Sequence, residues 1–154
     1  PSLIAKIISL ADFNSSDTVL IIGSSTGYSS AILSNIAETV ISIEEDDQLV
    51  NFSENIVLDK KIDNVVFLKK DLNEGCPEHG PFNKILIEGA VEDIPNYLFE
   101  QLDENGKMIA IIANGDLSEV REYNKVGENI GSKFLFNCEA PKLKAFNKTD
   151  SFNF

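Results

Sequence analysis

Thr18-Val-Leu-Ile-Ile-Gly-Ser-Ser-Thr-Gly-Tyr28 is the stretch that decides the fold of this chain. Its first part, residues 19–22, is a short run of apolar residues that would be buried on both faces of a strand. Such a run is typical of a central strand in a parallel sheet that is covered on both sides. The run stops at Gly23, and a helical apolar spacing begins after Gly27. We therefore predict a strand, a tight turn and a helix.

The turn between this strand and this helix is a candidate ligand site. Unpaired N–H groups and the positive end of the helix dipole converge where a strand leads through a glycine-bounded turn into a helix. The candidate binding residues in the turn are Gly23, Ser24, Ser25 and Gly27. The glycines could also do no more than make the turn tight. Our hypothesis is that the turn holds a nucleoside-bearing cofactor.

Length, composition and charge restrict the class of protein. A chain of 154 residues is long enough for one domain with a substantial core. The formal net charge of -12 argues against nucleic acid as a partner, because phosphate binding requires clustered Lys and Arg. No apolar run approaches the roughly 20 residues of a membrane span, and no signal peptide is visible. We expect a protein that binds neither nucleic acid nor membrane.

Cysteine and histidine are scarce. Cys76 and Cys138 are far apart in the sequence, which indicates reduced thiols in a cytoplasmic protein rather than a disulfide framework. The single histidine, His79, lies in a loop of Pro and Gly residues, where we expect it to face solvent. These residues form no group with the spacing of metal ligands, so we predict no metal site. No catalytic residue can be assigned from the sequence.

The rest of the chain alternates between helical and strand patterns. Four strand–helix alternations favour an α/β fold with right-handed crossovers and a doubly wound, mostly parallel sheet. Residues 120–126 and 133–138, which flank a glycine-containing turn, predict a C-terminal antiparallel hairpin at the sheet edge. The prediction is one domain, residues 1–154, with seven strands. Besides the hairpin, the predicted strands are residues 19–22, 39–43, 65–68, 84–87 and 107–113.

Two further expectations concern packing. The helix that begins after Asp46 or Asp47 presents an apolar face, to which we assign Leu49, Val50, Phe52, Ile56, Val57 and Leu58. The Lys-rich tail after Pro141, which ends in Phe152 and Phe154, is expected to pack loosely.

Acidic residues follow the predicted strands at the edge where ligands bind in open α/β sheets. Glu44 and Glu45 follow the second strand, Asp71 and Leu72 follow the third, and Glu88 follows the fourth. A carboxylate about 20 residues beyond the glycine turn is placed to accept hydrogen bonds from a ribose diol. Together these residues predict a cleft for a ribose, an exocyclic amine and a cationic group. Alternatively, Glu44 belongs to a solvated helix start, Asp71 to a Lys-rich loop and Glu88 to the surface.

In this order and spacing the motifs resemble the protein-L-isoaspartate O-methyltransferases. The resemblance covers roughly residues 1–113 and implies a class I S-adenosylmethionine-dependent, Rossmann-like methyltransferase fold whose terminal strands form a reversed hairpin. It further implies S-adenosyl-L-methionine as cofactor, with Glu44 on the ribose, Asp71 near the adenine and the glycine turn beside the methionine portion. The matching motifs are residues 19–28, Ser42-Ile-Glu44, Asp71 with Gly75, Phe82-Asn-Lys-Ile-Leu-Ile-Glu-Gly-Ala90, Ile94-Pro95, Leu98, Gln101-Leu102 and Asn105-Gly106.

The chain also departs from this family. Members usually carry an acid where this chain has Ile21, and a third glycine where it has Ser25. The first change removes a polar anchor for the methionine end, and the second adds a Cβ that narrows the approach to the cofactor. The family's substrate-binding N-terminal segment, with its active-site hydroxyl residue, would precede Pro1.

Three functions follow as hypotheses. The first is methyl transfer to the isoaspartyl-type carboxylate of a protein or peptide, which needs no general base because the nucleophile is already ionised. The second is a non-catalytic relative that binds S-adenosyl ligands or has lost that binding. The third is a nicotinamide-dependent oxidoreductase, which is less favoured because the glycine spacing is Gly-x-x-x-Gly rather than Gly-x-Gly-x-x-Gly.

Overall fold

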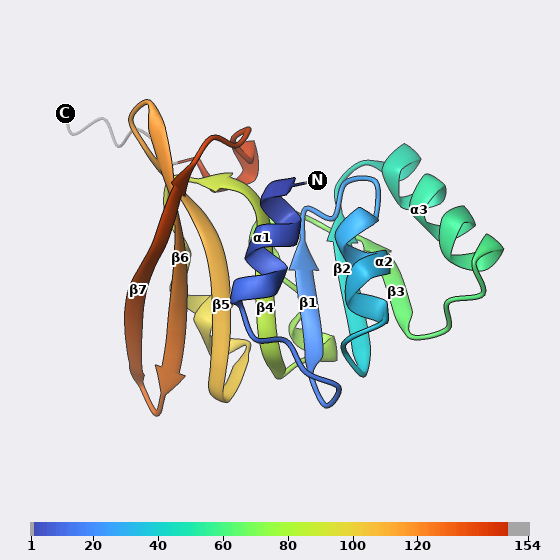
Figure 1. The fold of residues 1–154 in the computed structure, drawn as a ribbon, viewed down its shortest axis with the longest axis horizontal. Coiled ribbons are helices and arrows are strands. Elements are labelled where there is room, and N and C mark those ends of the chain that lie inside the picture. The colour runs from blue at the N-terminus through green and yellow to red at the C-terminus, as the bar shows by residue number, and fades with distance from the viewer. Residues whose placement is uncertain (1, 148–154) are drawn as a thin grey trace.

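A computed structural model describes residues 2–147, which form one seven-stranded sheet with helices on both faces (Figure 1). The strand order is β3-β2-β1-β4-β5-β6-β7, and β1 to β5 are parallel. Strands β6 and β7 follow as an antiparallel hairpin at the edge, which confirms the predicted fold class. The strands are β1 (Thr18–Ile22), β2 (Thr39–Glu44), β3 (Val65–Lys69), β4 (Phe82–Val91), β5 (Leu102–Asn114), β6 (Leu117–Val126) and β7 (Asn129–Cys138).

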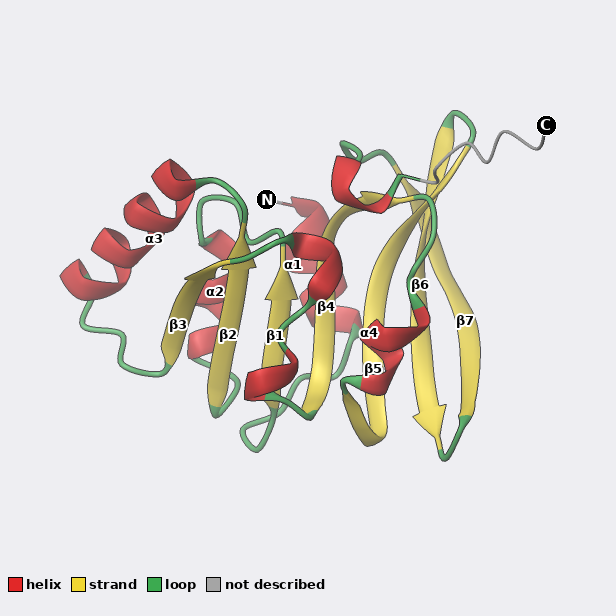
Figure 2. Ribbon diagram, turned by 180° about the vertical axis from the view of Figure 1, so that it is seen from behind, coloured by secondary structure: helices red, strands yellow, loops and turns green. Residues whose placement is uncertain are grey.

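The helices are α1 (Ser2–Leu10), α2 (Tyr28–Ser34), α3 (Asp47–Asp59) and α4 (Asn96–Glu100). Helices α1 and α2 cover one face of the sheet, and α4 lies on the opposite face (Figures 1 and 2). The connection from β3 to β4 contains only two short 3₁₀ turns, Leu72–Glu74 and Pro77–His79, in agreement with the predicted Gly- and Pro-containing loop.

Strand β1 is central and is buried on both faces. Its side chains alternate between two apolar clusters, with Leu20 and Ile22 in one and Val19 and Ile21 in the other. All of these residues are 0% exposed. This arrangement confirms the prediction made from the apolar run, and it fixes the glycine turn at the carboxyl edge of the sheet.

Several strand boundaries and part of one helix differ from the prediction, and the hairpin strands β6 and β7 begin at Leu117 and Asn129 rather than at residues 120 and 133. Strand β4 does not end at Ile87 but continues to Val91, and β5 begins at Leu102 rather than at residue 107. On α3, Phe52 is 51% exposed and Leu58 is 75% exposed, so their assignment to the apolar face was wrong. The helix lies beside the edge strand β3 and packs mainly through a narrow stripe, the buried residues of which include Val50 and Val57.

Residues 141–146, here called the C-terminal strap, pack against the carboxyl end of β4. The N–H of Ala90 donates to the Pro141 carbonyl at 2.9 Å, and the N–H of Leu143 donates to the Ala90 carbonyl at 2.8 Å. Phe146 is 4% exposed and belongs to the apolar cluster that contains Leu20. The expectation of loose packing is therefore wrong for the strap, whereas Phe152 and Phe154 lie outside the described residues.

Candidate functional site

The turn after β1 contains three residues with positive φ: Gly23 at 79°, Ser25 at 50° and Gly27 at 80°. A Cβ on Gly23 would lie 3.2 Å from the Glu88 carbonyl oxygen, and one on Gly27 would lie 3.0 Å from Ser53 Oγ. The two glycines therefore let the turn lie against its neighbours. Ser25 adopts a left-handed conformation that is unfavourable for a residue with a Cβ.

The carboxylate of Glu44 holds this strained turn in place. Its Oε2 accepts a hydrogen bond from the Ser25 N–H at 2.9 Å, and its Oε1 accepts one from the Glu45 N–H at 2.9 Å. Glu44 is only 9% exposed, although it belongs to a run of four acids. Since an ionised carboxylate offers about four acceptor positions, it can still accept from a ligand hydroxyl.

The candidates after β2 and β3 lie further along the same edge. The Oε1 atom of Glu45 accepts from the Leu72 N–H at 3.2 Å, so the ends of β2 and β3 are joined through a side chain. Leu72 is 4% exposed, whereas Asp71 is exposed and its carboxylate makes no hydrogen bond within residues 2–147. A hollow of about 310 Å³ lies here, lined by Glu45, Lys69, Lys70, Asp71 and Glu74.

Buried oxygens without a hydrogen-bond partner gather near the turn. Across the part of the chain that the structure describes, these side-chain atoms are Ser24 Oγ, Ser29 Oγ and Glu88 Oε1. Burial raises the pKa of Glu88 to about 7; the Ser29 hydroxyl lowers it and the Glu44 carboxylate raises it further. A buried polar atom without a partner costs about 1–3 kcal/mol. Three such atoms at one strand edge indicate a place where a ligand completes the hydrogen bonds.

The C-terminal strap forms a wall of this region. A Cβ on Gly89 would lie 2.5 Å from Leu143 Cγ, and a Cβ on Gly23 would lie 3.4 Å from Leu143 Cδ1. Leu143 thus fills the space between the turn and the end of β4. Sequence reasoning missed both Ser29 and Leu143. A small polar residue at the start of the predicted helix was a weak signal for Ser29, but nothing local placed residue 143 beside residue 23.

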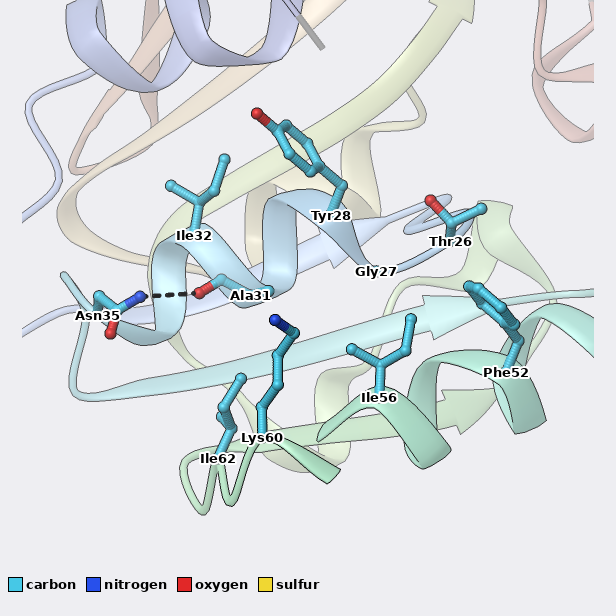
Figure 3. A pocket seen from close by; sticks show the side chains of 10 residues that line it. All are labelled: Thr26, Gly27, Tyr28, Ala31, Ile32, Asn35, Phe52, Ile56, Lys60 and Ile62. Atoms are coloured by element: carbon cyan, nitrogen blue, oxygen red, sulfur yellow. Dashed lines mark hydrogen bonds between the residues drawn. The ribbon is translucent and has the colours of Figure 1, made fainter. Parts of the chain in front are cut away.

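A larger hollow, of about 610 Å³, lies between α2 and α3 (Figure 3). It begins beside Gly27, but its lining contains no acidic residue and is mostly apolar. The acids of the strand edge are absent from it. We therefore assign the candidate site to the strand edge and not to this hollow.

Neither the cysteines nor His79 lines the hollow beside Asp71 or belongs to the group of unpartnered oxygens. Both cysteines are free, and burial raises the pKa of the Cys76 thiol to about 11, so it remains protonated near neutral pH. His79 is exposed, as predicted. No helix within residues 2–147 is long and apolar enough to cross a membrane.

The arrangement can be compared with known proteins. Residues 1–138 match the family described as Protein-L-isoaspartate(D-aspartate) O-methyltransferase (PCMT). The chain belongs to the PCMT family. This confirms the resemblance seen in the sequence motifs. The methyltransferases of this family depend on S-adenosylmethionine.

Curated relatives of the PCMT chain carry the same family name. This chain is 34% identical over 116 residues to a protein-L-isoaspartate O-methyltransferase of Jannaschia sp.. The aligned residues make up 75% of this chain and 52% of that protein. A relative named in the same way, from Azorhizobium caulinodans, is 30% identical over 146 residues, or 94% of this chain and 67% of that protein. The chain thus spans about half the length of some of the curated relatives it matches.

Solved structures agree with the fold. A protein-L-isoaspartate O-methyltransferase structure superposes with a TM-score of 0.86 at 25% identity, over 93% of this chain and 47% of that one. A structure from Plasmodium falciparum is named for the same activity and contains S-adenosyl-L-homocysteine. It gives a TM-score of 0.71 at 28% identity, and the match covers 92% of this chain and 71% of that chain. These matches confirm the Rossmann-like methyltransferase fold.

Proposed function

We propose that this PCMT chain binds S-adenosylmethionine at the carboxyl edge of β1, β2, β3 and β4 and transfers its methyl group to an isoaspartyl-type carboxylate of a protein or peptide. The observation that carries the proposal is the group of buried, unpartnered oxygens on Ser24, Ser29 and Glu88 beside a strained glycine turn. Family membership supplies the class of reaction.

The residues along the edge fit the successive parts of the cofactor. Glu44 lies beside the turn with acceptor capacity left over, as a ribose diol requires. Asp71 and the Leu72 N–H would receive the adenine, once Glu45 releases that N–H. The buried oxygens near Gly23 would receive the methionine portion. This is the set of site residues that the sequence predicted, with Ser29 added.

When bound, the cofactor supplies an electrophilic methyl group on a positively charged sulfur. An ionised substrate carboxylate would accept this methyl group without losing a proton, so the chain needs no general base. What the protein must provide is alignment and exclusion of water. Leu143 of the C-terminal strap packs against the turn at Gly23 and would help to exclude water.

The proposal is tested with labelled S-adenosylmethionine and two peptides of the same composition, one with isoaspartate and one with normal aspartate. We expect base-labile methyl ester on the isoaspartyl peptide only. Binding of S-adenosylhomocysteine is measured in parallel by calorimetry. Absence of both ester and binding would refute the proposal.

A second function is favoured by two residues of the same region. Ile21 is 0% exposed within an apolar cluster and gives the methionine end no polar group, and Ser25 puts a Cβ in a position with positive φ. Both changes favour a non-catalytic protein that binds S-adenosyl ligands. Tight binding without ester formation would support this alternative, and ester formation would exclude it.

A further inference from the structure

Glu88 lies in an irregular part of β4. Leu86 pairs with Ile109 of β5 and Ala90 pairs with Ile111, so three residues of β4 lie opposite Ala110 alone. The φ of Gly89 in this bulge is 139°. Bulges next to functional sites change the direction of a side chain. Here the Glu88 side chain comes close enough to Ser29 and Glu44 for both to influence its pKa.

Within residues 2–147 the carboxylate of Glu88 forms no ion pair, and neither does that of Glu44. Among the same residues no donor lies in hydrogen-bonding geometry to Oε1 of Glu88. The Oγ atoms of Ser24 and Ser29 have no partner there either, although the Ser29 hydroxyl is close enough to lower the Glu88 pKa. A ligand with a cationic donor can therefore pair with the Glu88 carboxyl, and the hydroxyls can in turn donate to an anionic oxygen.

Ile21 of the neighbouring strand β1 has no polar atom that could pair with the Glu88 carboxyl. Ile21, near the carboxyl end of β1, is fully buried among Val19, Leu86 and other apolar side chains. Of the groups on S-adenosylmethionine, the sulfonium carries charge but no N–H, whereas the ammonium group carries three donors and lies next to a carboxylate.

We propose that Glu88 binds the ammonium group of the methionine portion of the cofactor, with the Ser24 and Ser29 hydroxyls beside the adjacent carboxylate. This inference rests on the proposed function. Glu88 would then determine specificity, because it would favour ligands with an amino-acid end over nucleosides without one. The bulge in β4 would supply the polar group for the methionine portion that Ile21 of β1 does not supply.

The test compares two ligands that share the adenosine thioether. S-adenosylhomocysteine carries the amino-acid end, and 5′-methylthioadenosine does not. Affinities are measured by isothermal titration calorimetry for the wild-type chain, for Glu88→Gln, and for Glu128→Gln as a matched control. Glu128 is exposed in the turn between β6 and β7, at the opposite end of the sheet (Figure 1).

We expect Glu88→Gln to lower the affinity for S-adenosylhomocysteine by at least about tenfold, because a charged hydrogen bond is lost. The affinity for 5′-methylthioadenosine should stay unchanged. Glu128→Gln should change neither affinity. Equal losses for both ligands would mean that Glu88 only supports the fold of the site, and no loss would mean that it does not contact the amino-acid end; either result overturns the inference. Wild-type chain that binds neither ligand would overturn the proposed function as well.

Discussion

Replacement of Glu88 by glutamine should make the protein more stable at alkaline pH and not at acidic pH. The pKa of Glu88 rises from an ordinary value of 4.5 to about 7 in the folded chain, mainly through burial. Glutamine has nearly the same shape as the protonated side chain but cannot ionise. The variant therefore isolates the free energy of ionising this one group in its buried position.

The sign follows from proton linkage. Below pH 4.5 the carboxyl group is protonated in both the folded and the unfolded state, and ionisation makes no difference. Between pH 4.5 and about 7 the unfolded state releases the proton while the folded state keeps it, so wild-type stability falls. A shift from 4.5 to about 7, at 1.36 kcal/mol for each pKa unit, amounts to about 3 kcal/mol. The full penalty is present above pH 7.

The assay is urea unfolding followed by circular dichroism at pH 4.5, 6 and 8. We expect the free energy of unfolding of Glu88→Gln, relative to wild type, to increase by about 3 kcal/mol from the lowest to the highest pH. Glu128→Gln, an exposed control, should show no such trend. A difference between Glu88→Gln and wild type that is the same at all three pH values would refute the reasoning, since it would mean that Glu88 ionises normally in the folded protein.

Three other perturbations test the site and the scaffold. Glu44→Ala should weaken the binding of S-adenosylhomocysteine by about 1–3 kcal/mol, measured by calorimetry, because a charged hydrogen-bond acceptor is lost. An unchanged affinity would show that the ribose assignment is wrong. Ser25→Gly should raise the free energy of unfolding by up to about 1 kcal/mol and leave ligand binding the same or tighter, since glycine tolerates the φ of 50°; lower affinity would mean that the hydroxyl contacts the ligand. Lys84→Met should destabilise the chain by about 3–5 kcal/mol, because the Nζ of Lys84 lies 3.0 Å from Oδ2 of Asp17 in a buried ion pair. In urea unfolding, adding Asp17→Asn to Lys84→Met should restore part of that loss, and further destabilisation would contradict an unpaired charge as the cause.

The central part of the fold could be predicted from the sequence because its signals are local. The apolar run that ends at Ile22 is short, is bounded by glycine and is followed by a helical spacing, and each of these features acts over a few residues. The position of Glu44 followed from strand length and from the parallel arrangement. Its role in holding the Ser25 N–H did not, because a ribose acceptor and a turn-stabilising acceptor have the same sequence signature.

Features that depend on contacts between distant segments were missed. The bulge at Glu88 is a shift in the register between β4 and β5, and no local sequence pattern specifies that register. Exposure of Phe52 depends on the position of α3 beside an edge strand, which leaves only a narrow stripe for packing. The Lys-rich composition of residues 142–144 favoured a solvated tail, but apolar contacts through Leu143 and Phe146 outweighed it.

The C-terminal strap has a consequence for the order in which the site is completed during synthesis. The turn at Gly23, the acceptor at Glu44 and the bulge at Glu88 all precede it in the chain, whereas Leu143 leaves the ribosome more than 50 residues after Ala90, to which the strap is hydrogen-bonded. Until then the region between the turn and β4 is open to water on one side. A protease cut between β7 and Pro141 would reopen that side and leave every strand of the sheet uncut.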